Sequence, residues 1–160
     1  MKYFAAILFC LAILGISKEK IREADKKKNE LFEFLSLVRH LKKEIGSFMK
    51  PIGKALENFN SKSDAVSELV LAVQNGEEIK AAYLRLSESF DLTDEIKAVL
   101  LRTFSALGSS YLEENIKILN FAEGELCERS EELAKKNAQS VKIIQTLSAT
   151  VCAAVIIAVI

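Results

Sequence analysis

Apolar and charged residues are unevenly distributed along the chain, with two uncharged ends around a charged middle. Residues 3–16 and 143–160 contain no charged side chain, and every charged residue except Lys2 lies between Lys18 and Lys142. Within the middle, apolar residues recur at the spacing of one helix face, and no convincing strand alternation is present. The pattern predicts an all-α protein, an antiparallel helical bundle between two terminal helices. The predicted domains are residues 1–17, 18–142 and 143–160.

The two uncharged ends have the composition of membrane-spanning helices. At ~1.5 Å per residue, the C-terminal segment reaches ~27 Å, close to the ~30 Å of a bilayer core. A buried core helix is the alternative reading. The N-terminal segment reaches only ~21 Å, so it fits a short retained span or a cleaved signal peptide with Gly15-Ile16-Ser17 as cleavage site. The helical pattern continues unbroken through Ile21, which favours the retained span.

Basic residues beside these ends predict an orientation. Six lysines and arginines follow the first end within residues 18–28, and four precede the second within residues 129–142. Basic residues accumulate on the cytoplasmic side of a membrane, so we expect the middle to be cytoplasmic and both termini to lie across the cell membrane. Signal-peptide cleavage would instead place the middle outside. The Lys26-Lys27-Lys28 run either contacts anionic lipid headgroups or only determines topology.

Breakers and capping residues divide the middle into several helices. Gly46 is predicted to break the first long helix, and Pro51 to open a short one. Ser63 or Asp64 caps the next helix, which ends at Asn75-Gly76. Helices over 79–90 and 96–107 follow. The apolar faces of these helices carry Leu31, Leu35, Val38, Leu41, Ile45, Ile52, Ala55, Leu56, Phe59, Val66, Leu69, Val70, Val73, Ile79, Ala82, Tyr83, Leu86, Phe90, Ile96, Val99, Leu100, Thr103, Phe104 and Leu107.

The stretch 107–110 is predicted to be a helix corner. Gly108 follows the last apolar position of one helix, and Ser110 and Glu113 have the spacing of a capping box for the next. From Tyr111 the helical pattern runs without a breaker to Ile160. Polar residues interrupt its seven-residue leucine repeat, so we favour a long helix packed on the bundle over a pure coiled coil. The repeat comprises Leu112, Leu119, Leu126 and Leu133, and the interrupting residues are Glu123, Ser130 and Asn137.

Charge and motif content argue against several functions. The chain has 22 Lys and Arg residues and 22 Asp and Glu residues, whereas a nucleic-acid binder needs a basic face. Its single histidine, His40, lies on a polar helix face, where a surface residue is the expectation. The sequence contains no metal-ligand spacing, HExxH, GxSxG or phosphate-binding glycine loop, and neighbours such as Glu113 and Glu114 diverge on a helix. We therefore expect no enzymatic activity, no cofactor, no metal, no nucleic acid and no small-molecule substrate.

Three stretches of the middle form a recognisable set: LKKEIGSFMKPIGKAL (41–56), NGEEIKAAYLRL (75–86) and TFSALGSSYLEENI (103–116). With the two uncharged ends, their order and spacing resemble stage III sporulation protein AB over essentially the whole chain. The landmark positions are Glu44, Ile45, Pro51, Ala55, Gly76, Ala82, Tyr83, Phe104, Leu107 and Gly108. The chain departs from the family pattern at Ser105, Tyr111, Asn115 and Ser148, where the family usually has Gly, Asp, Gln and Gly.

The resemblance implies a membrane component of the sporulation machinery of endospore-forming bacteria. Its implied partners are a secretion-type ATPase and the channel proteins that link mother cell and forespore, and it is similar to the cytoplasmic domain of type II secretion F platform proteins. We accordingly expect a non-enzymatic platform in the mother-cell membrane, in contact with lipid. The alternatives are a general secretion or pilus platform of the F type outside sporulation, and a secreted, tail-anchored helical protein. The partner-docking surface and the oligomeric state are not readable from the sequence.

Overall fold

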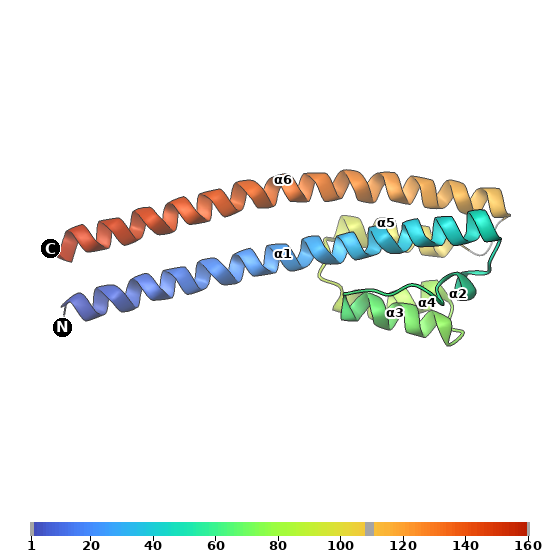
Figure 1. Ribbon diagram of the computed structural model, residues 1–160, viewed down its shortest axis with the longest axis horizontal. Helices are drawn as coiled ribbons and strands as arrows, with labels where there is room; N and C mark the ends of the chain where they lie inside the picture. Colours follow the sequence, from blue (N-terminus) through green and yellow to red (C-terminus); the bar gives the residue numbers. More distant parts are fainter. Residues whose placement is uncertain (1, 108–110, 160) are drawn as a thin grey trace. The chain divides into compact units, whose positions relative to one another are not determined.

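The computed structural model describes residues 2–107 and 111–159, which contain helices and no strand. The all-α prediction is therefore confirmed. The predicted roles of Gly108 and Ser110 fall outside the described residues. The elements are α1 (Lys2–Phe48), α2 (Ile52–Ala55), α3 (Asp64–Gln74), α4 (Ile79–Leu86), the 3-10 turn η1 (Ser87–Ser89), α5 (Asp94–Ala106) and α6 (Leu112–Val159) (Figure 1).

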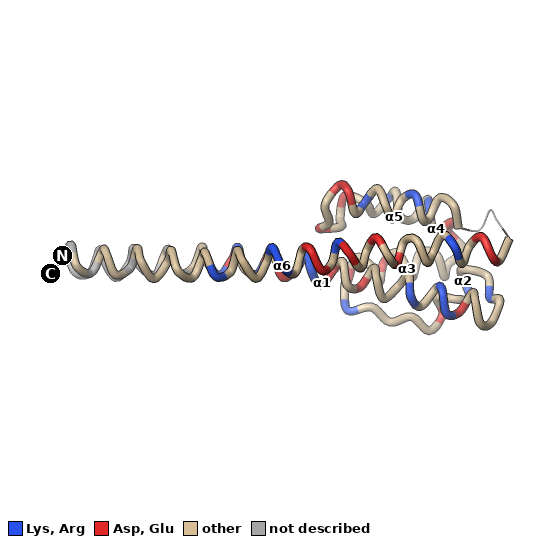
Figure 2. The backbone as a smooth tube through the Cα atoms, turned by 90° about the horizontal axis from the view of Figure 1, so that it is seen from above, with Lys and Arg blue, Asp and Glu red and all other residues tan. Residues whose placement is uncertain are grey.

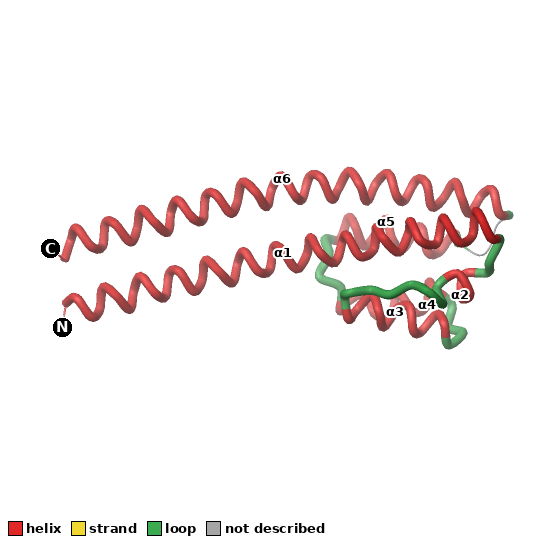
Figure 3. Tube along the Cα trace, in the orientation of Figure 1, coloured by secondary structure: helices red, strands yellow, loops and turns green. Residues whose placement is uncertain are grey.

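The chain divides into two compact units, and each is described by itself. One unit comprises Met1–Lys26 and Glu132–Ile160, and the other comprises Lys27–Glu131. Within the second unit, α3 packs against α2 and α4, and α4 packs against α5. The loops that join these helices are traced in Figure 3. This unit is the helical bundle, and its core determines where the candidate site lies.

The core of the bundle forms where the predicted apolar faces meet. The α1 stripe of Leu31, Leu35, Val38, Leu41 and Ile45 is buried as predicted, and Phe34 and Leu37, which the prediction did not include, are buried beside it. Four aromatic rings from α1, α4, the segment after η1, and α5 lie at its centre. The ring centroids of Phe34 and Phe90 are 4.9 Å apart, and those of Tyr83 and Phe104 are 5.2 Å apart. Offset and edge contacts of this kind add to the stability that burial provides.

The prediction that Gly46 ends the first helix was wrong. Helix α1 continues to Phe48, and Met49 then takes the left-handed backbone conformation with φ of 51°. Gly46 instead serves close packing, because a Cβ atom there would lie 2.8 Å from Cδ1 of Ile116 on α6. Helices commonly end at a residue in the left-handed conformation, usually glycine. Here that residue is Met49, three positions after Gly46.

Two other helices end earlier than predicted. Helix α2 ends at Ala55, and the Leu56 carbonyl that follows accepts hydrogen bonds from the Phe59 backbone at 3.0 Å and from Gln74 Nε2 at 2.7 Å. At the end of α4, the Ser89 hydroxyl donates to the Leu86 carbonyl at 2.6 Å. Such side-chain bonds compete with helix continuation. Phe90 consequently follows the helix in extended backbone, yet its ring is buried in the core.

Other predicted boundaries hold. Asn75 is the C-cap of α3, and Gly76 follows with φ of 96°, a left-handed conformation that glycine accepts without steric cost. Ser63 is the N-cap of the same helix, although its side chain makes no capping hydrogen bond. Helix α6 starts at Leu112 and has no break through Val159, as the pattern from Tyr111 predicted.

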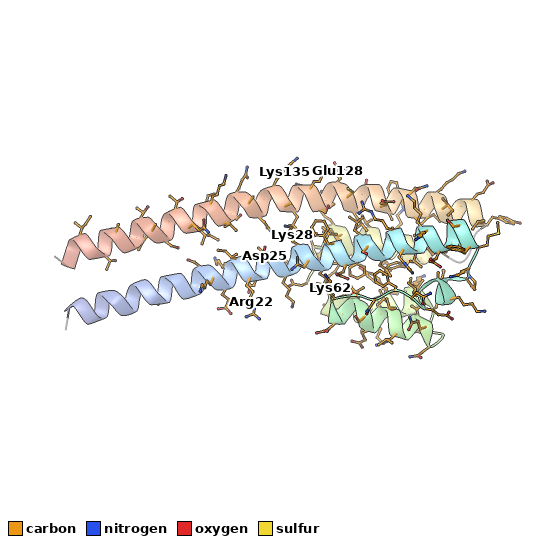
Figure 4. All side chains as sticks on the ribbon, in the orientation of Figure 1. Arg22, Asp25, Lys28, Lys62, Glu128 and Lys135 are labelled. Carbon is orange, nitrogen blue, oxygen red and sulfur yellow. The ribbon has the colours of Figure 1, made fainter. Side chains whose placement is uncertain are left out.

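Polar residues of the α6 seam have specific partners in the bundle. Leu119 and Leu126 are fully buried, and between them Glu123 accepts hydrogen bonds from Arg39 at 2.8 Å and Lys42 at 2.7 Å. Glu128 lies on the side of α6 turned away from α1 (Figure 4). A coiled coil needs apolar residues at both repeating seam positions. Here Glu123 with its two ion pairs lies between Leu119 and Leu126, as expected for a long helix packed on a bundle.

The unit formed by the two chain ends has polar contacts between its helices. Ser17 and Ser148 share a hydrogen bond of 2.7 Å between their hydroxyl oxygens, and Asn137 Nδ2 donates to the Ala24 carbonyl at 3.0 Å. Ser148 is buried, whereas the large aliphatic side chains of Ile143 and Leu147 are 59% exposed. Among the residues that the structure describes, no helix is long and apolar enough to cross a membrane.

Candidate functional site

A groove opens in the bundle between α2, the α3–α4 connection and the end of α5. We call it the α2–α5 groove. Its volume is about 450 Å³, which is within the range of natural binding sites. Its lining residues are Ile52, Gly53, Val73, Gly76, Glu77, Glu78, Ile79, Ser105 and Leu107.

The floor of the groove is apolar because core residues reach it from three helices. Val73, Ile79 and Leu107 belong to the predicted apolar faces and are almost fully buried. Gly53 and Gly76 contribute backbone without a side chain, and a Cβ atom on Gly53 would make only an ordinary contact of 3.6 Å with the Val73 carbonyl oxygen. An alanine at Gly53 would therefore fit without displacing the Val73 carbonyl.

The charged residues that line the groove are both acidic. Arg85 donates to both carboxylate oxygens of Glu77, at 2.9 and 3.3 Å, and this hydrogen bonding lowers the pKa of Glu77. Glu78 is exposed and has no ion-pair partner within the described part of the chain. Elsewhere in the bundle, acidic and basic residues are interspersed (Figure 2). The groove thus combines an apolar floor with two rim glutamates, of which Glu77 is paired with Arg85 and Glu78 is exposed.

Landmark residues from the stretches 75–86 and 103–116 line this groove, and a landmark residue of the stretch 41–56 lies next to it. Gly76 comes from the second stretch and Leu107 from the third, while Pro51 of the first precedes the lining residue Ile52. Most of the other landmarks are core residues. These are Ile45, Ala55, Ala82, Tyr83 and Phe104. Glu44 forms an ion pair with Lys50 at 2.5 Å, a hydrogen bond that lowers the pKa of Glu44, and Gly108 lies outside the described residues.

Sequence reasoning did not single out the acidic rim. Glu77 and Glu78 directly follow the helix-ending Gly76, and that adjacency was the available signal. Ser105 was noted only as a departure from the family pattern. Nothing in the spacing of α2, α3 and α5 along the chain indicated that their ends meet, because long-range packing determines that convergence.

His40 was expected to be a surface residue, and it is partly exposed and has a structural contact. Its ring is half-buried, and Nε2–H donates to the Ala55 carbonyl at 2.8 Å. The ring also lies 5.3 Å from that of Phe59. The residue therefore ties α1 to α2 and satisfies a carbonyl at the end of a short helix.

Fold and site together define an all-helical protein whose bundle carries an open groove with an apolar floor and an acidic rim. A family model described as stage III sporulation protein AB matches residues 2–160. The chain belongs to this family, and the resemblance of the three sequence stretches is confirmed. No curated protein and no solved structure gives a significant match.

Proposed function

We propose that this sporulation protein is a non-enzymatic membrane platform. Its terminal helices anchor it in the mother-cell membrane, and its bundle docks partner proteins in the cytoplasm. Family membership supplies the link to stage III of sporulation. The partners that the resemblance implies are a secretion-type ATPase and the components of a channel between mother cell and forespore.

One observation carries the membrane part of the proposal: polar groups lie between the two terminal helices while aliphatic groups face outward. Ser148 is 7% exposed and bonded to Ser17, whereas Ile143 and Leu147 are largely uncovered. A soluble helix pair buries its large aliphatic side chains. Small and polar residues at the helix contact, with aliphatic residues outside, are the arrangement favoured in lipid. This distribution supports burial of the outer surface in a bilayer.

The orientation is supported by the basic residues beside the terminal helices. They gather within 18–28 and 129–142, the ends that would face the cytoplasm. We test this with a chain whose native cysteines are replaced by serine and whose exposed loop residue Asn60 is changed to cysteine. In intact sporulating cells, an impermeant maleimide should leave this cysteine unlabelled, and opening the cells should allow labelling. Labelling in intact cells would contradict the cytoplasmic orientation.

Anchorage and role need separate measurements. The full chain should stay with the membrane fraction after alkaline carbonate extraction, and its intact mass should include residues 1–16. Release into the supernatant would overturn the membrane proposal, and a mass without those residues would indicate signal cleavage. Deletion of the gene should reduce heat-resistant spore counts without slowing vegetative growth. A growth defect in vegetative cells would favour the general secretion alternative.

A further inference from the structure

We propose that the two terminal helices bind the phosphate groups of anionic phospholipids through cationic side chains that follow their uncharged ends. These side chains, which we call the collar, are Lys18, Lys20 and Arg22 of α1 and Lys142 of α6. All of them belong to the unit that the chain ends form. The collar can meet lipid only if the terminal helices are embedded in a bilayer, so this inference rests on the proposed membrane anchorage and adds a lipid class to it.

Two contacts between α1 and α6 bracket the collar. Ser17 and Ser148 share a hydrogen bond on one side of it, and Asn137 donates to the Ala24 carbonyl on the other side. The α1 residues of the collar lie between Ser17 and Ala24, and its α6 residue lies between Asn137 and Ser148. The cations therefore share one band, which covers roughly 10 Å along the helix pair. This band adjoins the uncharged end of each helix, where the phosphates of the cytoplasmic leaflet would lie.

The collar cations are exposed, and none forms an ion pair with another residue that the structure describes. The same band contains Glu19 and Glu23, which lie three residues from Arg22 and Lys20 respectively. Side chains at this spacing can pair on a helix surface, but no such ion pair forms here. Even if both carboxylates were paired, two cations would remain. Arg22 extends from α1 to the side away from α6 (Figure 4), where an external anion can reach it.

Two lysines of the Lys26-Lys27-Lys28 run, which follows the collar in sequence, already have contacts within the chain. Lys27 forms an ion pair with Asp91 at 3.7 Å, and Lys28 Nζ lies 5.8 Å from the ring centroid of Phe32. The sequence left open whether this run contacts lipid or only determines topology. These contacts favour the collar over the run as the site for lipid phosphate.

Aliphatic side chains beside the collar favour a lipid over a free anion. Ile16 is 62% exposed, and Ile143 and Leu147 are each 59% exposed. They lie on the side of the collar that faces the uncharged ends. A phospholipid can cover these groups with its acyl chains while its phosphate lies against the cations, whose apolar stems extend along the same surface. A free phosphate ion would leave the aliphatic groups uncovered.

The first experiment measures lipid preference by electron paramagnetic resonance. The full chain is reconstituted in phosphatidylcholine vesicles that contain a trace of either phosphatidylglycerol or phosphatidylcholine with a spin label on the acyl chain. Lipid in contact with the protein gives a motionally restricted signal. Phosphatidylglycerol should associate roughly threefold more strongly than phosphatidylcholine, and high salt should reduce the difference. Equal association of the two lipids would overturn the proposal. If the protein restricted neither lipid, the membrane anchorage would be wrong, and the collar proposal with it.

Substitution of the collar identifies the residues responsible. The collar variant combines Lys18→Gln, Lys20→Gln, Arg22→Gln and Lys142→Gln, and the two lipids should associate with it about equally. A matched control removes the same charge from exposed lysines of the bundle and should keep the parent's preference. Its substitutions are Lys43→Gln, Lys54→Gln, Lys62→Gln and Lys80→Gln. A preference that persists in the collar variant, or that disappears in both proteins, would overturn the proposal.

A second variant tests the same site by a gain of preference, which a protein that failed to insert could not show. Glu19→Gln combined with Glu23→Gln removes the carboxylates of the band and should raise the preference for phosphatidylglycerol about twofold. Glu57→Gln combined with Glu88→Gln, at exposed positions of the bundle, should leave it unchanged. Inorganic phosphate and chloride at equal ionic strength should weaken the preference equally. An unchanged preference in the Glu19 and Glu23 variant, or a greater loss in phosphate than in chloride, would contradict a lipid site at the collar.

Discussion

Gly46 of α1 and Ile116 of α6 lie so close that a Cβ atom on Gly46 would stand 2.8 Å from Cδ1 of Ile116. The glycine lies inside a continuous helix, where it lowers helix stability relative to alanine by about 1 kcal/mol. That cost is offset by the close approach of α6. Cδ1 is the flexible end of the Ile116 side chain, so we expect it to move partly aside when alanine replaces Gly46.

A double-mutant cycle tests this contact. Gly46→Ala gains helix propensity but must displace Cδ1 of Ile116, whereas in an Ile116→Val background that atom is absent. We expect Gly46→Ala to be more favourable in the valine background, with a coupling energy of at least ~0.5 kcal/mol in the free energy of unfolding. Chemical denaturation of all four proteins measures it. Equal effects of Gly46→Ala in both backgrounds would show that the two residues do not interact.

Gly124 provides a contrasting case on α6. Nothing lies within 4 Å of a Cβ atom built there, and its backbone is helical. Gly124→Ala should therefore raise the free energy of unfolding by roughly 0.5–1 kcal/mol. Gly76→Ala is the matched opposite, because that site is equally open but has φ of 96°, and it should destabilise the protein. A destabilising Gly124→Ala would reveal a packing role that the bundle does not account for.

Helix content and core could be predicted well from the sequence, because local spacing encodes both. The α1 stripe and the glycine end of α3 follow from side-chain period and backbone preference. The ends of α1 and α4 could not be predicted in this way. Gly46 is predicted to break the helix, and only the position of α6 shows that it serves close packing instead. Phe90 is predicted to be helical, but the hydroxyls of Ser87 and Ser89 hydrogen-bond to the carbonyls of Leu84 and Leu86 before it.

The candidate site was less predictable than the fold. The landmark residues Gly76 and Leu107 were identified, but as markers of family and not as neighbours across a groove. That Glu77, Glu78 and Gly53 line one groove could not be predicted, because it depends on how the ends of three helices pack together. Similarly, the sequence shows Glu123 only as a polar interruption of the leucine repeat. The structure shows that it forms ion pairs with Arg39 and Lys42 on α1.

Tyr83 offers a test of a polar group in the aromatic core. Its hydroxyl donates to the Lys97 carbonyl at 3.0 Å, and burial raises the pKa of this phenol far above its usual range. Tyr83→Phe keeps the ring but leaves that carbonyl without this donor. It should lower the free energy of unfolding by about 0.5–1.5 kcal/mol. Thermal or chemical unfolding measures the change.

Tyr111 is the control for this substitution, because it is 89% exposed. Tyr111→Phe should change stability by less than ~0.5 kcal/mol. Tyr111→Asp, which restores the residue type usual in the family, should be equally tolerated, since an acidic residue suits the start of α6. A loss in Tyr111→Phe as large as that in Tyr83→Phe would mean that the Lys97 bond does not explain the result.

Glu123 should make the bundle less stable in acid. Hydrogen bonds from Lys42 and then Arg39 lower its pKa in the folded protein, whereas the unfolded chain has the ordinary glutamate value of about 4.3. Because the folded pKa is lower, the stabilisation is fully present above the unfolded pKa and is lost as the pH falls through the folded pKa. The free energy of unfolding should therefore decline below about pH 4.3. Denaturation midpoints measured between pH 7 and pH 3 follow this change.

Substitution of Glu123 by glutamine isolates this contribution. Glu123→Gln keeps the size of the side chain but removes the titrating charge beside Lys42 and Arg39, so the variant should be less stable than the parent at pH 7 and approach it in strong acid. The parallel variant Glu128→Gln changes an exposed glutamate on the outer side of α6, and its pH profile should match the parent's. If Glu123→Gln and the parent lost stability in parallel as the pH fell, the acid sensitivity would originate from other carboxylates, and the ion pair between α1 and α6 would add little to the fold.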